Sequence, residues 1–356
     1  MSIKSSTFAG RNGKKTMIKA LEDIVSQYEQ TQIFVLADSC LALDLPYPTL
    51  RIEASEENKS LESASEIWTW LTKKNATRKA VLVNIGGGTI CDLGGFAAAT
   101  YLRGIDYINV PTTLLAMVDA AIGGKTGVNH GGLKNRVGVF RMPKAVIIEP
   151  SFLETLPTDE LLSGFGEVLK TALLIGDGVF ASALSALDKL ASLGRLSRVS
   201  QLIDTCRAYK ESVVAQDSTE TGLRKVLNFG HTVGHAIEES LASHSEKVTL
   251  PAAKRSLHGY CVVWGMVAEL YLSVVLLGCP KELLQQMTKV LLDYYGRPNC
   301  NCKQQEELIN FMRQDKKNAA SDAINFTLLK KAGDPIINQV APKDLIKEAL
   351  DYLFSV

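Results

Sequence analysis

The chain lacks any marked excess of one charge: its 356 residues include 39 lysines and arginines against 38 aspartates and glutamates. This balance argues against a protein that binds nucleic acid or an anionic membrane surface through bulk charge. Paired cysteines are missing as well. The seven cysteines are an odd number with no Cys-x-x-Cys pair, which argues against a disulfide framework or a zinc knuckle and indicates reduced thiols in the cytoplasm.

An uninterrupted hydrophobic run of membrane-spanning length is also missing. The most apolar stretch, Cys261 to Cys279, contains Glu269, so we expect a buried helix there rather than a membrane span. The N-terminus, MSIKSSTFAGRNGKK, is polar and basic with no apolar segment behind it, which does not fit a secretory signal. These features predict a cytoplasmic protein with neither a membrane nor a nucleic-acid partner.

The character of the sequence changes between Pro150 and Pro157. Before this stretch, short β-branched runs alternate with helical patterns, which is typical of an α/β layer with a mostly parallel sheet. The runs are Ile33–Ala37, Ala80–Ile85, Tyr107–Val110 and Ala145–Ile148, and the helical patterns are Met17–Tyr28 and Ser60–Lys73. After it, helical patterns dominate: Asp159–Leu174, Val179–Leu193, Ser197–Ala215, Gly222–Leu241, Gly259–Leu277 and Lys281–Tyr295. We therefore predict an α/β domain over residues 1–152 and a mainly α-helical domain over residues 153–356.

Candidate functional residues are densest in Gly222–Glu238, GLRKVLNFGHTVGHAIE. If this segment is one helix, Arg224, Asn228, His231 and His235 fall at i, i+4, i+7 and i+11 and share one face, while apolar residues from Leu223 onward pack inward. The glycines inside it weaken a helix, which suggests that a metal or another chain segment approaches the backbone there. A buried helix with two hydrogen-bonded histidines is the alternative.

Two glycine-rich segments in the first half could bind a phosphate or a sugar. The strand Ala80–Ile85 runs into Gly86-Gly87-Gly88-Thr89, where backbone N–H groups at a helix start would favour an anion. Cys91 stands where a Gly-x-Gly-x-x-Gly motif has its last glycine, so a plain tight turn is equally compatible. The segment Val110–Asn129 with Lys134-Asn135 mixes hydroxyls, a carboxylate and lysines among glycines, and its alternative is a solvated loop.

In the second half, one carboxylate and two histidines have the composition of a metal site. Glu167, His231 and His258 would supply one oxygen and two nitrogens from separate segments and leave a position open for substrate, as in catalytic sites for zinc. His235, one turn after His231, is a candidate acid or base. A histidine that merely begins a helix is the alternative for His258.

Taken in order, nine motifs resemble those of the 3-dehydroquinate synthases, which are sugar-phosphate cyclases related to metal-dependent polyol dehydrogenases. The motifs are GGGTICDLGGF, ATYLRG, VPTTLLAMVD, GGKTGVN, LKN, FGEVLK, LRKVLNFGHTVGHAIE, LHG and DKK, and the resemblance extends from Asp38 to Lys317. It implies an NAD-binding α/β domain, a helical domain that binds metal and substrate, and an active site between them.

The resemblance also implies the reaction. The family members are carbon–oxygen lyases of the shikimate pathway, in aromatic amino acid biosynthesis, and they convert 3-deoxy-D-arabino-heptulosonate 7-phosphate to 3-dehydroquinate and phosphate. NAD oxidises one hydroxyl of the sugar phosphate, phosphate is eliminated, hydride returns and the ring recloses, so that NAD is regenerated in each turnover. The implied cofactors are NAD and a divalent metal, zinc or cobalt.

Site residues carry over motif by motif. The metal ligands correspond to Glu167, His231 and His258. The NAD contacts correspond to Asp38, Glu56, Lys59, Gly87, Gly88, Thr89, Asp92, Thr112, Thr113, Lys134, Phe152 and Thr155. The substrate contacts correspond to Asp119, Lys125, Asn135, Lys170, Lys210, Arg224, Asn228 and either Lys316 or Lys317. The proton acceptors correspond to Glu220 and His235, and the catalytic lysines to Lys125, Lys170 and Lys210. Arg103 corresponds to an arginine that reaches the neighbouring active site in a homodimer.

Four positions depart from the family pattern: Met117, Ser163, Ser218 and Tyr260. They bear on cofactor packing and the surroundings of His258, because no ligand or charged substrate contact is lost. A sibling cyclase for another sugar phosphate would differ around Asn228, His235 and Lys210, which here match the dehydroquinate pattern. A polyol dehydrogenase would release NADH and lack the concentrated cations, and a non-enzymatic scaffold would have lost a ligand or proton carrier.

Overall fold

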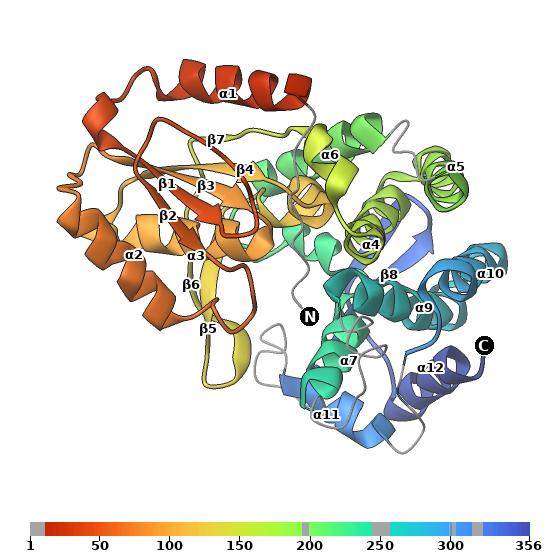
Figure 1. The fold of residues 1–356 in the computed structure, drawn as a ribbon. Helices are drawn as coiled ribbons and strands as arrows, with labels where there is room; N and C mark the ends of the chain where they lie inside the picture. The colour runs from red at the N-terminus through yellow and green to blue at the C-terminus, as the bar shows by residue number, and fades with distance from the viewer. Residues whose placement is uncertain (1–10, 194–198, 244–256, 299, 301–303, 315–322) are drawn as a thin grey trace, which may run out of the picture. The chain divides into compact units, whose positions relative to one another are not determined.

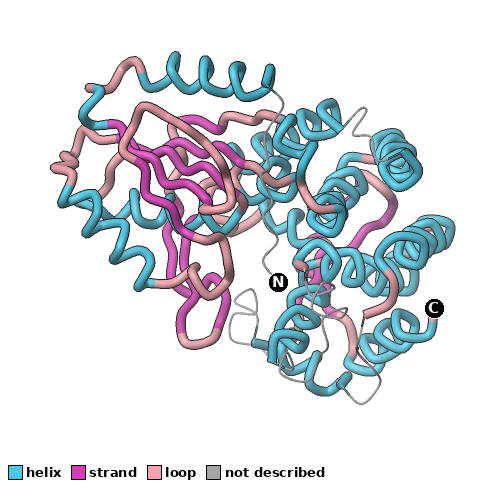
Figure 2. Tube along the Cα trace, viewed as in Figure 1, coloured by secondary structure: helices cyan, strands magenta, loops and turns pink. Residues whose placement is uncertain are grey.

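The computed structural model describes residues 11–193, 199–243, 257–298, 300, 304–314 and 323–356. The chain divides into two compact units, Met1–Pro157 and Thr158–Val356 (Figures 1 and 2). The predicted boundary after residue 152 falls within the 3₁₀ helix Pro150–Thr155, a few residues before this division.

Five parallel strands form the main sheet of the first unit, in the order β2-β1-β3-β4-β7 (Figure 2). The strands are β1 (Ile33–Asp38), β2 (Thr49–Ile52), β3 (Val81–Gly86), β4 (Asp106–Pro111) and β7 (Ala145–Val146). The predicted strands match β1, β3, β4 and β7 to within two residues at either end. The edge strand β2 was not predicted, because only its last residue is buried and it shows no apolar run.

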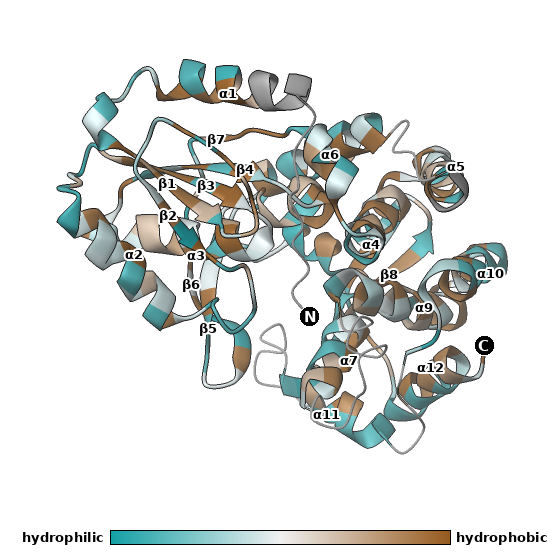
Figure 3. Ribbon diagram, viewed as in Figure 1, coloured by the Kyte–Doolittle hydropathy of each residue, from teal (hydrophilic) through white to brown (hydrophobic). Residues whose placement is uncertain are grey.

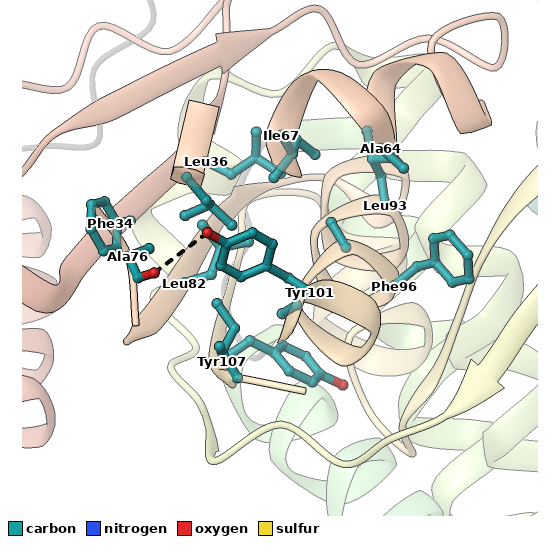
Figure 4. Packing of buried hydrophobic residues seen from close by; sticks show 14 of the residues in the cluster. Phe34, Leu36, Ala64, Ile67, Ala76, Leu82, Leu93, Phe96, Tyr101 and Tyr107 are labelled. Carbon is teal, nitrogen blue, oxygen red and sulfur yellow. Dashed lines mark hydrogen bonds between the residues drawn. The ribbon is translucent and has the colours of Figure 1, made fainter. Parts of the chain in front are cut away.

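The core of this unit lies between the sheet and two helices, α2 (Leu61–Lys73) and α3 (Gly88–Thr100). Phe34, Leu36 and Leu82 point to one face of the sheet because strand side chains alternate, and they pack with Ile67 of α2 and Leu93 of α3 (Figure 4). Figure 3 shows the same strands as predominantly hydrophobic. A third helix, α1 (Arg11–Val25), precedes β1.

The glycine-rich segment after Asp119, in which no strand was predicted, forms a β hairpin. Strand β5 (Lys125–His130) pairs antiparallel with β6 (Leu133–Phe140), and the two glycines between them turn the chain with φ of +61° and +76°. Asp119 itself lies in the short π-helix Ala116–Ala120. The hairpin therefore gives a fixed position to polar residues that would otherwise belong to a loop.

Helices dominate the second unit, as predicted. They are α4 (Thr158–Ile175), α5 (Asp177–Leu193), α6 (Val199–Gln216), α7 (His231–Ser243), α9 (His258–Leu277), α10 (Lys281–Val290), α11 (Gln305–Gln314) and α12 (Lys343–Ser355). A π-helix, Leu291–Tyr295, follows α10, and an unpredicted hairpin joins β8 (Asn325–Lys331) to β9 (Asp334–Val340). Helix α9 is long and apolar enough to cross a membrane, but 72% of its most apolar window is buried in the protein. It packs against α4, α7, α10 and α12, which confirms the prediction of a buried helix (Figure 1).

The prediction of one continuous helix from Gly222 to Leu241 is wrong. The segment forms a 3₁₀ helix, Leu223–Asn228, and then restarts as α7 at His231, because Gly230 adopts φ of +77°. The buried carboxylate of Glu269 on α9 accepts the backbone N–H groups of Gly230, Thr232 and Val233 at 2.6, 3.0 and 3.2 Å. A negative charge is stabilising at a helix N-terminus, so this contact favours a new start. Leu223, predicted to pack inward, is 43% exposed.

Candidate active-site residues

A carboxylate and two histidines from three helices face a common point. Oε1 of Glu167, on α4, lies 3.3 Å from Nε2 of His258 and 3.5 Å from Nε2 of His231. These histidines are the first residues of α9 and α7, and Glu167 is fully buried. The structure thus brings together the three residues predicted from the sequence as metal ligands.

In each histidine, Nε2 faces Glu167, and Nδ1 has a partner of its own that favours metal binding through Nε2. Nδ1 of His231 is 3.1 Å from the carbonyl oxygen of Phe229, and Nδ1 of His258 is 3.1 Å from Oε2 of Glu238. When Nδ1 donates its proton to such an acceptor, Nε2 keeps its lone pair for a metal. Two imidazole nitrogens and a carboxylate oxygen with these partners fit a divalent ion such as zinc.

The charges around this cluster also favour a cation. Burial lowers the pKa of His258, but the carboxylates of Glu238 and Glu167 outweigh it and raise this pKa to about 10. Nζ of the buried Lys170 lies 2.5 Å from Oε2 of Glu167, so the second carboxylate oxygen is held by a fixed ammonium group. The lysine leaves Oε1 directed at the histidines.

His235 lies beside the proposed ligands. Its ring centroid is 5.1 Å from that of His231 and 5.8 Å from that of His258, and nitrogens of the three rings lie within 4.8 Å of one another. At this distance, the side chain can act as a further ligand or exchange a proton with a molecule bound at the cluster.

Glycines next to the ligands let the three helices come this close. A Cβ atom on Gly259 would lie 1.7 Å from the carbonyl oxygen of Ser163, and one on Gly166 would lie 2.4 Å from that of Gly259. Just before α7, a Cβ at Gly230 would lie 2.5 Å from Cγ of Met266, and on α7 one at Gly234 would lie 2.8 Å from the carbonyl oxygen of Cys261. Therefore, the segment that approaches Gly230 and Gly234 is α9.

The turn before α7 arranges a second polar group. The Asp217 carboxylate accepts the backbone N–H groups of Thr221, Gly222 and Arg224 at 3.1, 2.8 and 3.0 Å. These hydrogen bonds, that from Gly222 above all, lower the pKa of Asp217 to about 2. Nδ2 of Asn228 donates to Oε1 of Glu220 at 2.9 Å, and Glu220 itself has φ of +63°. Two predicted substrate contacts and one predicted proton acceptor therefore come from a single turn.

In the first unit, the glycine turn that follows β3 lies close against the segment that follows β4. The N-cap residue of α3 is Gly87, which has no side chain that could accept a hydrogen bond from the first N–H groups of the helix. A Cβ on Gly87 would lie 3.1 Å from Cγ2 of Thr113, and one on Gly88 would lie 3.2 Å from Cβ of Ala120. A helix N-terminus preceded by glycine is a suitable binding place for a phosphate group.

A polar network connects five predicted residues that are distant in sequence. Nζ of Lys59 lies 2.6 Å from both Oδ2 of Asp92 and Oδ1 of Asn135. Asn129 joins them to the loop before α2: its Oδ1 accepts the Asn135 N–H at 2.9 Å, and its Nδ2 donates to Oε2 of Glu56 at 2.9 Å. Nζ of Lys134 lies 3.9 Å from the same Glu56 oxygen.

The remaining predicted residues are spread over both units. Asp38 ends β1, where its Oδ1 accepts the N–H of Cys40 at 3.2 Å. Three of the other residues are buried (Phe152, Thr112 and Lys210), one is partly buried (Thr89), and three are exposed (Lys125, Thr155 and Arg103). Lys316 and Lys317 lie outside the described residues.

The departures from the family pattern have identifiable surroundings. Oγ of Ser163 accepts the N–H of Gly259 at 3.2 Å, at the start of the helix that carries His258. The Tyr260 ring packs edge-on to Tyr295 at 5.0 Å, and the carbonyl oxygen of Ser218 accepts Nη1 of Arg224 at 2.7 Å. Met117 is fully buried in the π-helix. Ser163 and Ser218 therefore support residues of the site.

Three carboxylates that hold site residues or their backbone by hydrogen bonds were not predicted from the sequence: Asp217, Glu238 and Glu269. Glu238 follows His231 by seven positions, so helical spacing could have placed it on the ligand-bearing face. Glu269 is the lone charge in an apolar stretch, which is itself a signal, but its partners on α7 could not be read from spacing.

The fold is that of sugar-phosphate cyclases. A solved structure of 2-deoxy-scyllo-inosose synthase, complexed with carbaglucose-6-phosphate, NAD+ and Co2+, superposes with a TM-score of 0.75 at 22% identity and covers 94% of both chains. A second structure, 2-epi-5-epi-valiolone synthase from Streptomyces hygroscopicus subsp. jinggangensis with NAD+ and Zn2+ bound, gives a TM-score of 0.73 at 24% identity and covers 90% of this chain and 91% of the other.

Within that class, the chain belongs to the 3-dehydroquinate synthase family. Family models described as 3-dehydroquinate synthase N-terminal and 3-dehydroquinate synthase C-terminal match residues 49–163 and 164–318. A 3-dehydroquinate synthase from Parabacteroides distasonis is 42% identical over 350 residues, which are 95% of this chain and 96% of the relative. The predicted family is thereby confirmed.

Proposed function

We propose that this protein converts 3-deoxy-D-arabino-heptulosonate 7-phosphate to 3-dehydroquinate and phosphate in the cytoplasm. The observation that carries the proposal is the convergence of Glu167, His231 and His258, which are oriented by Lys170, the carbonyl group of Phe229 and Glu238, respectively. Membership of the 3-dehydroquinate synthase family selects this reaction among those of the cyclases. The proposed NAD contacts all lie in the first unit and the proposed metal ligands all lie in the second, which supports an NAD-binding first domain and a metal-binding second domain. The proposed substrate contacts Lys170, Lys210, Arg224 and Asn228 also lie in the second unit, whereas Asp119, Lys125 and Asn135 lie in the first.

In this proposal, Glu167, His231 and His258 hold a divalent metal, zinc or cobalt. NAD binds at the glycine turn of the first unit, through Asp38, Glu56, Lys59, Gly87, Gly88, Thr89, Asp92, Thr112, Thr113, Lys134, Phe152 and Thr155. When bound, NAD supplies reversible hydride transfer and the metal supplies Lewis-acid polarisation of substrate oxygens.

The chain's own residues bind the substrate and move its protons. Arg224 and the predicted lysines neutralise its phosphate and carboxylate, since a guanidinium can bind an anion through two hydrogen bonds. Arg224 is 1% exposed, and hydrogen bonds from its backbone N–H to Asp217 and from its Nη1 to the carbonyl oxygen of Ser218 hold the side chain in one place. The imidazole of His235 and the carboxylate of Glu220 take up protons, and Asn228 orients Glu220 through the hydrogen bond between them.

Turnover distinguishes this function from its alternatives. The purified protein is supplied with NAD, a divalent metal and 3-deoxy-D-arabino-heptulosonate 7-phosphate, and phosphate, carbocycle and NADH are measured. We expect equimolar phosphate and 3-dehydroquinate with no net NADH. Stoichiometric NADH without phosphate would instead indicate a polyol dehydrogenase. Turnover only with a seven-carbon sugar phosphate that lacks the carboxylate would indicate a sibling cyclase.

We also propose that the protein forms a homodimer in which Arg103 reaches the partner's active site. Arg103 is exposed and follows Leu102, which is 45% exposed, and both have positive φ. Gly104 approaches Arg141 at the end of the β5–β6 hairpin, near Phe140 and Met142, which are 52% and 55% exposed. Large apolar side chains exposed together favour burial against another chain.

Subunit mixing tests the role of Arg103. The variants Arg103→Ala and His231→Ala should each be inactive alone, but a mixed dimer pairs one intact metal site with an intact arginine from the partner. Random mixing should therefore restore about a quarter of the wild-type activity, because half of the dimers are mixed and each has one complete site. No recovery in mixtures shown by tagged pull-down to contain mixed dimers would contradict the proposal.

A further inference from the structure

Glu238 is a buried carboxylate that none of the assigned roles includes. It lies on α7, seven residues after His231, so that two helical turns place both side chains on the same face. Its Oε2 is 3.1 Å from Nδ1 of His258, across the contact between α7 and α9. One helix therefore carries a proposed metal ligand together with the hydrogen-bond partner of another.

The position of Glu238 shows that it is not a ligand itself. Nδ1 and Nε2 of an imidazole lie on different sides of the ring, and Nε2 of His258 is the atom that lies 3.3 Å from Glu167. Glu238 thus binds the ring from the side away from the shared point. A carboxylate in this place fixes which nitrogen has the proton, holds the ring plane and makes Nε2 a stronger donor.

The two histidines differ in this respect. His231 has a backbone carbonyl, that of Phe229, as its outer partner, whereas His258 has a charged side chain. The carbonyl cannot be removed by a side-chain substitution, but the charge on Glu238 can. His258 is also the more exposed of the two, at 28% of its side chain against 10% for His231, so packing alone restrains it less.

We propose that Glu238 is a positioning residue that holds His258 in its metal-binding tautomer and thereby sets the affinity of the protein for its divalent ion. The inference rests on the proposed metal site, but it concerns a residue outside that ligand set. It predicts that removing the charge of Glu238 weakens metal binding while the metal-free protein keeps its fold.

The test measures metal affinity directly, without substrate. Full-length metal-free wild type, Glu238→Gln, Glu238→Ala and His231→Ala are titrated with Co2+, by calorimetry and by visible absorption, well below the melting temperature of each variant. Glu282→Gln, which removes an exposed carboxylate on α10, is the control for the loss of one charge. Melting temperatures of the metal-free proteins show whether the fold is affected.

We expect Glu282→Gln to bind Co2+ as the wild type does and His231→Ala not to bind. Glu238→Gln should bind about 10- to 100-fold more weakly with a shifted cobalt spectrum, and Glu238→Ala more weakly still. Wild-type affinity and spectrum in Glu238→Gln, beside loss of binding in His231→Ala, would overturn the inference and leave the metal site standing. Failure of the wild type to bind Co2+ or Zn2+ would overturn both.

Discussion

Replacement of Gly259 by alanine should separate the two helices that carry Glu167 and His258. The added Cβ would lie 1.7 Å from the carbonyl oxygen of Ser163 and 2.5 Å from its carbonyl carbon, both of which are backbone atoms that cannot rotate away. Ordinary contact begins at 3.4 Å, so α4 and α9 must move apart locally by about 1.7 Å.

The two consequences of that movement differ in size. Overpacking of this kind costs about 1–3 kcal/mol of folding free energy, which a two-unit protein can survive. A metal site tolerates displacement of its ligands by only about 0.5 Å, so binding should fail even in molecules that fold. We therefore expect Gly259→Ala to lower the melting temperature moderately and to abolish tight Zn2+ binding.

The matched control is Gly178→Ala in the first turn of α5, where no heavy atom lies within 4 Å of the added Cβ. This change should leave Zn2+ binding unaltered and stabilise the protein by about 0.4–1 kcal/mol, because alanine restricts the unfolded chain. Zn2+ titration and thermal melting of both variants provide the comparison. Wild-type zinc affinity and melting temperature in Gly259→Ala would refute the account of how the helices position the ligands.

Three further outcomes are expected. His231→Ala should lose both bound metal and turnover, and full activity in the metal-stripped variant would refute its assignment as a ligand. Glu269→Gln should lose about 1.5–3 kcal/mol of stability in urea unfolding, because an amide replaces a charged acceptor of three N–H groups; an unchanged midpoint would contradict this. Asp217 has a depressed pKa, so its stabilisation is complete above the unfolded value near 3.8 and is lost as the pH falls toward about 2. The difference in free energy of unfolding between wild type and Asp217→Asn should therefore shrink over that pH range. A difference that stays constant would contradict the proposed role of the Asp217 carboxylate.

Local patterns in the sequence determined much of the architecture. Strands β1, β3 and β4 are buried apolar runs bounded by turn residues, and α4, α5, α6 and α9 have long helical patterns, so each could be recognised without its neighbours. The ligands Glu167, His231 and His258 could be proposed from residue type and motif order, because few side chains bind a divalent ion and their surrounding motifs are specific.

Tertiary contacts decided the features that the patterns missed. The break before His231 arises because Glu269, 39 residues beyond Gly230, places a buried negative charge on the N–H groups that begin α7. The β5–β6 hairpin was missed because its polar and glycine-rich strands pair with each other rather than form apolar runs. Strand β8 does contain a buried run, Phe326 to Leu329, but a run this short does not by itself distinguish a strand from part of a buried helix. The pairing of His258 with Glu238 likewise depends on the contact between α7 and α9, which brings together residues 20 positions apart.

By itself, the sequence determined which residues are available for metal and cofactor chemistry, because that depends on the kind of side chain and its neighbours along the chain. Only the tertiary structure decided that Glu167, His231 and His258 meet at one point, because this depends on helix contacts such as that of Gly259 with Ser163. Close approach between segments 96 residues apart is a property of packing, and no periodicity along the chain encodes it.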